Sequence, residues 1–136
     1  MKSNESMENY LETILMLGKE RPVVRSVDIA ESLGFKKSSV SVAMKKLRER
    51  GDITVTKEGY IYLTESGKAI ADMIYERHVL ISGWLIAIGV DPDIAREDAC
   101  RIEHVLSKES FQAIKDHAKE NHSDVFEVAE NELSSK

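Results

Sequence analysis

The sequence predicts a mostly α-helical protein with one β-hairpin near its middle. Apolar residues recur at three- and four-residue steps over most of the chain, whereas segments 53–56 and 60–63 are β-prone and flank a glycine-containing loop. Three helical segments precede this hairpin, and only helical segments follow it. That order is typical of a winged helix-turn-helix domain, predicted at residues 1–64, followed by an all-helical domain at residues 65–136.

The three helices before the hairpin are predicted from periodicity and from their end signals. The first, residues 5–19, carries an apolar stripe made of Met7, Tyr10, Leu11, Ile14 and Leu15. Pro22 is expected to close it. Ser26 is predicted to cap a second helix that runs to Leu33, and Gly51 is predicted to end the third.

The C-terminal half is predicted to contain three further helices. A long one spans residues 65–88. Asp91 is a candidate N-cap followed by proline at the first helical position, which predicts a helix from there to about Leu106. Ser107 is predicted to cap a last helix that continues to about Lys119.

Composition favours a compact cytoplasmic protein. Among 136 residues there is a single cysteine, so an internal disulfide is excluded and a reducing compartment is expected. The longest apolar run, residues 79–90, is shorter than the roughly 20 residues of a membrane span, and the first residues lack the apolar core of a signal peptide. We therefore expect no membrane partner.

The net charge of −5 conceals a strongly basic segment. Between Lys36 and Arg50 six basic residues stand against one acidic residue, which is the local charge that binding to DNA phosphates requires. A helix of this length fits the major groove, with the hairpin beside it. The predicted DNA-binding residues are Ser26, Lys36, Lys37, Ser38, Ser39, Ser41, Lys45, Lys46, Lys57 and Tyr60. The alternatives are an ordinary lysine-bearing surface helix and a winged helix that binds protein.

A second group of residues has the chemistry of a metal site. Cys100, Glu103 and His104 stand at positions i, i+3 and i+4, which is one face of a helix. His78 and the pair Asn9 and Glu12 lie on other predicted helices. Imidazole, carboxylate, amide and thiolate are donors that borderline divalent transition metals accept together. Taken singly, each residue has a plainer explanation as a packed histidine, a small apolar thiol or a solvated carboxylate.

Several segments together resemble the diphtheria toxin repressor and manganese transport regulator family. They are Met7–Ile14, Val27–Leu33, Leu63–Lys68, Arg77–His78 and Glu97–Ser107. The resemblance implies a homodimeric repressor that binds double-stranded operator DNA, with Mn(II) or Fe(II) as its regulatory ion and no small organic ligand. It also implies the ligand set Asn9, Glu12, His78, Cys100, Glu103 and His104.

This ligand set combines features of two branches of the family. Glu12 matches the manganese branch and Cys100 the iron branch, whereas Asn9 offers only a neutral oxygen. Thiolate favours softer ions, so Co(II) and Zn(II) are possible substitutes and the preferred ion stays open.

The expected function is metal-dependent repression of metal-homeostasis genes, and no enzymatic activity is expected. No catalytic base, nucleophile elbow or phosphate loop stands out in the sequence. The alternative is a winged-helix regulator that ignores metal and uses Cys100 as a redox sensor.

Overall fold

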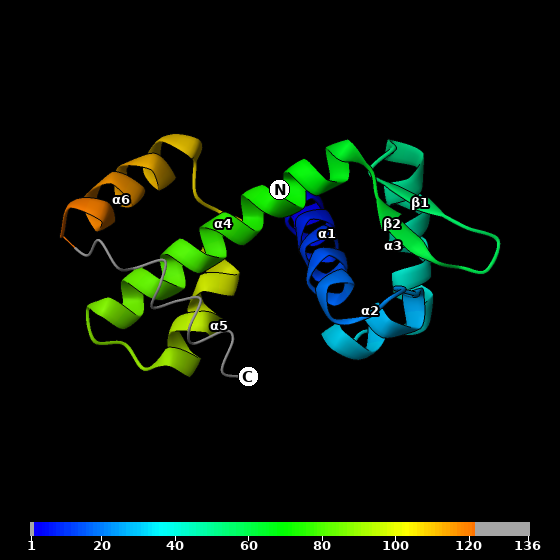
Figure 1. Ribbon diagram of the computed structural model, residues 1–136, viewed down its shortest axis with the longest axis horizontal. Coiled ribbons are helices and arrows are strands. Elements are labelled where there is room, and N and C mark those ends of the chain that lie inside the picture. The colour runs from blue at the N-terminus through cyan, green and yellow to red at the C-terminus, as the bar shows by residue number, and fades with distance from the viewer. Residues whose placement is uncertain (1, 122–136) are drawn as a thin grey trace. The chain divides into compact units, whose positions relative to one another are not determined.

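The computed structural model describes residues 2–121 (Figure 1). The elements are, in order, α1 (Lys2–Glu20), α2 (Ser26–Leu33), α3 (Lys37–Arg50), β1 (Ile53–Val55), β2 (Ile61–Leu63), α4 (Glu65–Ala87), α5 (Pro92–Ile102) and α6 (Lys108–Asn121). The predicted fold class is confirmed, since three helices and a hairpin precede a helical C-terminal half. The chain forms two compact units that divide between Met73 and Ile74. None of the helices described is long and apolar enough to cross a membrane.

The first unit has a single apolar core beneath α1, α2, α3 and the hairpin. Leu11 of α1, Ile29 of α2 and Val40 of α3 are fully buried in it. Leu47 of α3 and Ile53 of β1 extend this core toward the hairpin. Burial of these residues fixes the orientation of α3, because a helix with one apolar stripe exposes its opposite face.

The hairpin is a two-stranded antiparallel sheet with Ile53 opposite Leu63 and Val55 opposite Ile61. Gly59 has a φ of 86° in the connecting loop, a conformation that favours glycine. The backbone N–H of Ile61 donates a 2.8 Å hydrogen bond to the carbonyl of Val24. This bond ties the hairpin to the segment that leads into α2.

Two helix ends differ from the prediction. Ser26 is the first residue of α2 and not its cap; the carboxylate of Asp28 instead accepts a 2.9 Å hydrogen bond from the backbone N–H of Arg25. Helix α5 ends at Ile102, so the turn that follows contains Glu103. By contrast, the predicted cap at Asp91 is confirmed, because its carboxylate accepts from the backbone N–H groups of the next turn.

Gly67 allows α4 to begin directly against the end of α3. A Cβ atom at this position would lie 2.0 Å from the carbonyl oxygen of Asp52, which already accepts a hydrogen bond from the N–H of Thr64. We expect Gly67→Ala to lower the free energy of unfolding by about 1–3 kcal/mol, because the backbone must move to relieve the overlap. Urea unfolding followed by circular dichroism measures this change.

Gly18 provides the matched control for this substitution. It lies in α1, and a Cβ there would meet nothing within 4 Å. Gly18→Ala should therefore stabilise the protein by up to about 1 kcal/mol through helix propensity alone. Equal effects of the two substitutions would show that the contact with Asp52 is unimportant.

The second unit packs α5 and α6 against the C-terminal part of α4. Leu80 of α4 and Phe111 and Ala118 of α6 form its buried apolar cluster, with Trp84 and Ile114 at the border. An ion pair of 2.7 Å between Lys115 and Glu76 joins α6 to α4 at the surface. These contacts join α6 to α4.

Candidate metal centre and nucleic-acid interface

Three of the predicted metal ligands converge within the second unit. His78 lies in the middle of α4, Cys100 in the last turn of α5 and Glu103 in the turn that follows. One donor atom from each lies within 4.8 Å of the other two. The side chain of Glu103 is completely buried, His78 is half-buried and Cys100 is exposed, so the cluster reaches from the interior to the surface.

The carboxylate of Glu103 lies between two imidazoles. Its Oε2 accepts a 2.9 Å hydrogen bond from Nδ1 of His78, and its Oε1 lies 3.3 Å from Nε2 of His104. Burial lowers the pKa of His78, but the hydrogen bonds that it makes to Cys100 and Glu103, and the negative charges of these two groups, outweigh burial and raise the pKa to about 10. Without metal the cluster therefore holds a proton on His78, and a cation must replace that proton.

Arg77 positions the turn that carries Glu103. Its Nη1 donates hydrogen bonds of 3.1 Å to the carbonyl of Glu103 and 2.7 Å to the carbonyl of Leu106. Its guanidinium carbon lies 5.2 Å from the centre of the Phe111 ring. The side chain is buried, and so a single residue of α4 joins the turn to α6.

The donor set fits a divalent transition metal. Imidazole nitrogen, thiolate sulfur and carboxylate oxygen are accepted together by ions such as Fe(II), Co(II) and Zn(II). Bond lengths near 2.0–2.3 Å place two donors on one ion no more than about 4.5 Å apart, so the observed spacing requires only small side-chain movements. Three protein donors leave room for further ligands.

The remaining predicted ligands are His104, Asn9 and Glu12. His104 follows Glu103 in the same turn, and its side chain is close to the Glu103 carboxylate. Asn9 and Glu12 lie three positions apart on α1, which belongs to the first unit. Their part in the ligand set stays a prediction.

The predicted DNA-binding residues gather on the side of α3 that faces away from the core. Val40, Ala43, Met44 and Leu47 are buried and form the inner face of this helix. The predicted residues of this helix and its N-cap are all exposed: Lys36, Lys37, Ser38, Ser39, Ser41, Lys45 and Lys46. Lys57 is exposed in the hairpin loop, where Tyr60 is half-buried.

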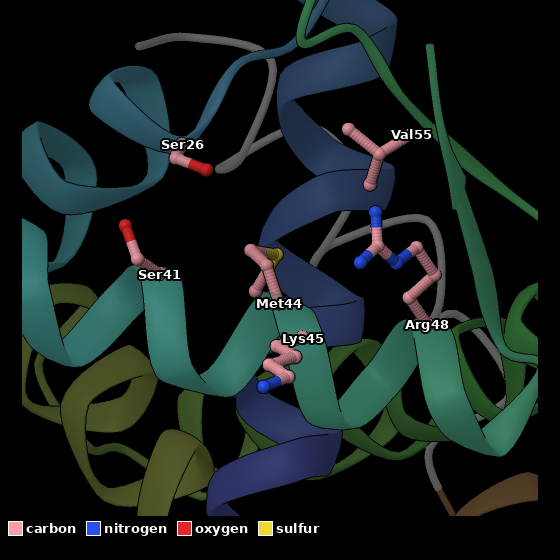
Figure 2. A pocket seen from close by; sticks show the side chains of 6 residues that line it. All are labelled: Ser26, Ser41, Met44, Lys45, Arg48 and Val55. Carbon is pink, nitrogen blue, oxygen red and sulfur yellow. The ribbon is translucent and has the colours of Figure 1, made fainter. Parts of the chain in front are cut away.

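A pocket of about 200 Å³ opens between α2, α3 and β1 (Figure 2). It is lined by Ser26, Ser41, Met44, Lys45, Arg48 and Val55. Figure 2 shows the two serine side chains on one side of the pocket and Arg48 on the other. Two hydroxyl groups and two cations around so small a volume have the chemistry of a site for one phosphate group.

Arg48 was not among the predicted DNA-binding residues, although its spacing from two of them could have identified it. Ser41, Lys45 and Arg48 stand at i, i+4 and i+7, and therefore on one face of the helix. Arg25 was missed as well: its guanidinium donates a 3.2 Å hydrogen bond to the hydroxyl of Tyr60 and lies 4.9 Å from the centre of its ring. Arg25 and Tyr60 are 35 positions apart in the chain, and local sequence patterns do not reveal a contact over that separation.

Comparison with protein families matches both halves of the chain. Residues 2–61 match the model described as iron dependent repressor, N-terminal DNA binding domain. Residues 64–125 match iron dependent repressor, metal binding and dimerisation domain. The first match contains α3 and β1, and the second contains His78, Cys100 and Glu103.

Individual relatives agree with these matches. The HTH-type transcriptional regulator MntR of Bacillus subtilis is 39% identical over 111 residues, which are 82% of this chain and 78% of that protein. The transcriptional regulator MntR of Escherichia coli O6:H1 is 34% identical over 111 residues, covering 82% and 72%. A solved structure, the manganese-dependent transcriptional repressor complex with manganese, has a TM-score of 0.76 at 26% identity and covers 82% of this chain. The chain spans about half the length of that structure.

Proposed function

Because the chain belongs to the iron dependent repressor family, we propose that it is a DNA-binding repressor of metal homeostasis that requires a divalent cation. The observation that carries the proposal is the donor cluster of His78, Cys100 and Glu103 in the segment matched as metal binding. The exposed basic face of α3 supports DNA as the partner. Members of this family are transcriptional regulators and not enzymes.

The ligand set that we propose comprises His78, Cys100, Glu103 and His104, together with Asn9 and Glu12. Proximity within the second unit supports the first four residues. The resemblance of Met7–Ile14 to the family pattern supports the last two. Mn(II) or Fe(II) is the proposed regulatory ion, and the thiol of Cys100 favours Fe(II), with Co(II) and Zn(II) as substitutes.

The proposed partners are operator DNA and a second copy of this chain. The model that matches residues 64–125 describes a dimerisation domain, which supports a homodimer. In such a dimer the two copies of α3 must be spaced by about one turn of the duplex, or a multiple of it, to enter successive major grooves. A repressor must share a compartment with its operator DNA, so the proposed location of this protein is the cytoplasm.

The residues of the centre provide a reason for DNA binding to depend on metal. A bound dication supplies positive charge and fixed coordination geometry at a buried anionic group. Without it, the buried carboxylate of Glu103 depends on the proton of His78 for compensation. His78, Cys100 and Glu103 would hold such an ion, which would join the end of α5 to the middle of α4 and make DNA-competent conformations more populated.

The proposal predicts that removal of metal weakens operator binding. A coupling free energy of up to about 3 kcal/mol corresponds to an affinity roughly 150-fold higher with metal than without. Gel-shift titrations of the full chain, with Mn(II), Fe(II), Co(II) or Zn(II) and then with excess chelator, measure this ratio on a duplex selected by the protein. Equal affinity before and after chelation would instead favour the metal-independent regulator.

A further inference from the structure

The β-hairpin carries one cation and one anion at adjacent positions of its loop. Lys57 and Glu58 lie between β1 and β2, and both are exposed. DNA phosphates attract the lysine and repel the glutamate. The hairpin therefore adds to DNA affinity only in an orientation that brings Lys57, and not Glu58, to the DNA backbone.

Hydrogen bonds within the loop fix its shape. The backbone N–H of Thr56 donates a 3.0 Å hydrogen bond to the carbonyl of Tyr60, and the N–H of Tyr60 donates one of 3.1 Å to the hydroxyl of Thr56. The N–H of Gly59 donates a further bond of 2.9 Å to the carbonyl of Thr56. Because the loop is closed in this way, the position of Lys57 depends on how the whole hairpin is held against the rest of the first unit.

Two adjacent contacts hold the hairpin to the segment that leads into α2. One is the backbone hydrogen bond from Ile61 to the carbonyl of Val24. The other joins two side chains, since the guanidinium of Arg25 donates a 3.2 Å hydrogen bond to the hydroxyl of Tyr60 and lies 4.9 Å from the centre of its ring. A single attachment lets a hairpin pivot, whereas two neighbouring attachments fix its direction.

The main chain of Arg25 is held in place by the first turn of α2. Its backbone N–H donates a 2.9 Å hydrogen bond to the carboxylate of Asp28. The same carboxylate forms an ion pair of 2.7 Å with Arg21, which directly follows α1. The side chain of Arg25 therefore extends to the hairpin from a fixed point of the helical part of the unit.

We propose that Arg25 and Tyr60 are positioning residues for DNA binding, and that their contact directs the hairpin so that Lys57 reaches a phosphate. This inference rests on the proposed function, because it requires the hairpin to lie on DNA. It gives Tyr60 an indirect role in place of the DNA contact expected from the sequence. A cation over an aromatic ring is favourable even at an exposed site, so water does not abolish the contact.

The test measures the salt dependence of DNA binding by the full chain, with Mn(II) present, on a duplex that it selects from DNA with a randomised core. Each cation on a phosphate contributes about 0.9 to the slope of log affinity against log salt. Tyr60→Leu removes no charge, so the slope changes only if a cation elsewhere leaves its phosphate. We expect the slope of the dimer to become shallower by about 2, so that raising salt from about 50 to about 200 mM costs the variant about 10-fold less affinity than the parent.

Further variants identify the cation and the pair that positions it. Lys57→Ala should change the slope as much as Tyr60→Leu does, and the two together should change it no further. Arg25→Met should match Tyr60→Leu, and that double variant should match either single one. Tyr62→Leu is the matched control, because Tyr62 is a neighbouring tyrosine of the hairpin that is 47% exposed, and it should keep the slope of the parent.

The outcomes separate this inference from the proposed function. An unchanged slope in Tyr60→Leu would overturn the inference, and so would a further change when Tyr60→Leu is added to Lys57→Ala, because the positioned cation would then not be Lys57. Thermal unfolding checks each variant, and Arg25→Met replaces an exposed residue, so it provides the test if Tyr60→Leu fails to fold. Either failure on a duplex bound only with metal leaves the proposed function intact, whereas selection of no duplex under any of the four metals would overturn both.

Discussion

Replacement of Glu103 by glutamine is expected to lower metal affinity at least about 100-fold and to abolish the metal response of DNA binding. Residues that only support metal ligands already contribute 10–100-fold to affinity, so a direct anionic ligand contributes at least the upper end of that range. The side chain is completely buried and adjoins both His78 and His104, so no solvent or exposed carboxylate can take its place. Competition with a fluorescent metal indicator measures the affinity.

Glutamine keeps the shape of the side chain, removes its charge and replaces one acceptor oxygen with an NH2 donor. The matched control is Glu97→Gln on α5, because Glu97 is an exposed carboxylate in the same unit. That variant should bind metal as the parent does. Metal affinity of Glu103→Gln within threefold of the parent, in a protein of normal thermal stability, would remove Glu103 from the proposed ligand set.

The order of the elements could be predicted from the sequence because each depends on local signals. The apolar stripe of α1, the glycine at position 51 and the Asp91–Pro92 pair act within a few residues of themselves. The exact end of α5 could not be predicted from the sequence, because it depends on contacts with another helix. Arg77 holds the carbonyls of Glu103 and Leu106, 26 and 29 positions away along the chain.

The candidate centre shows the same division between local and distant effects. The spacing of Cys100 and Glu103 predicted that they share one face of a helix, and the structure brings their donor atoms together although Glu103 lies in the turn after α5. The position of His78 beside these two residues was expected from the family resemblance. Spacing could not predict it, because helix periodicity does not indicate which helices pack together. Burial of Glu103 between two histidines was not predicted, since it depends on how the turn folds back on α4.

Arg77→Met is expected to destabilise the second unit and to weaken metal binding, although Arg77 is not a proposed ligand. Hydrogen bonds from a charged donor contribute about 1.5–3 kcal/mol each, so the loss of two should lower the free energy of unfolding by about 3 kcal/mol or more. Methionine retains apolar contact with Phe111, which confines the loss to the polar contacts. Metal affinity should fall about 10–100-fold, because the turn that presents Glu103 is no longer held.

A general loss of stability and a specific loss of positioning give different results in this experiment. Hydrogen exchange of the metal-free protein should accelerate first at Val105, whose N–H bonds to the carbonyl of Ile102 within the turn, and later in α6. Arg101→Met is the matched control, because Arg101 is an exposed arginine of α5. If both variants lost metal affinity equally, the two hydrogen bonds of Arg77 would not be the cause. If only Arg77→Met loses affinity, these two hydrogen bonds hold the turn in its metal-binding conformation.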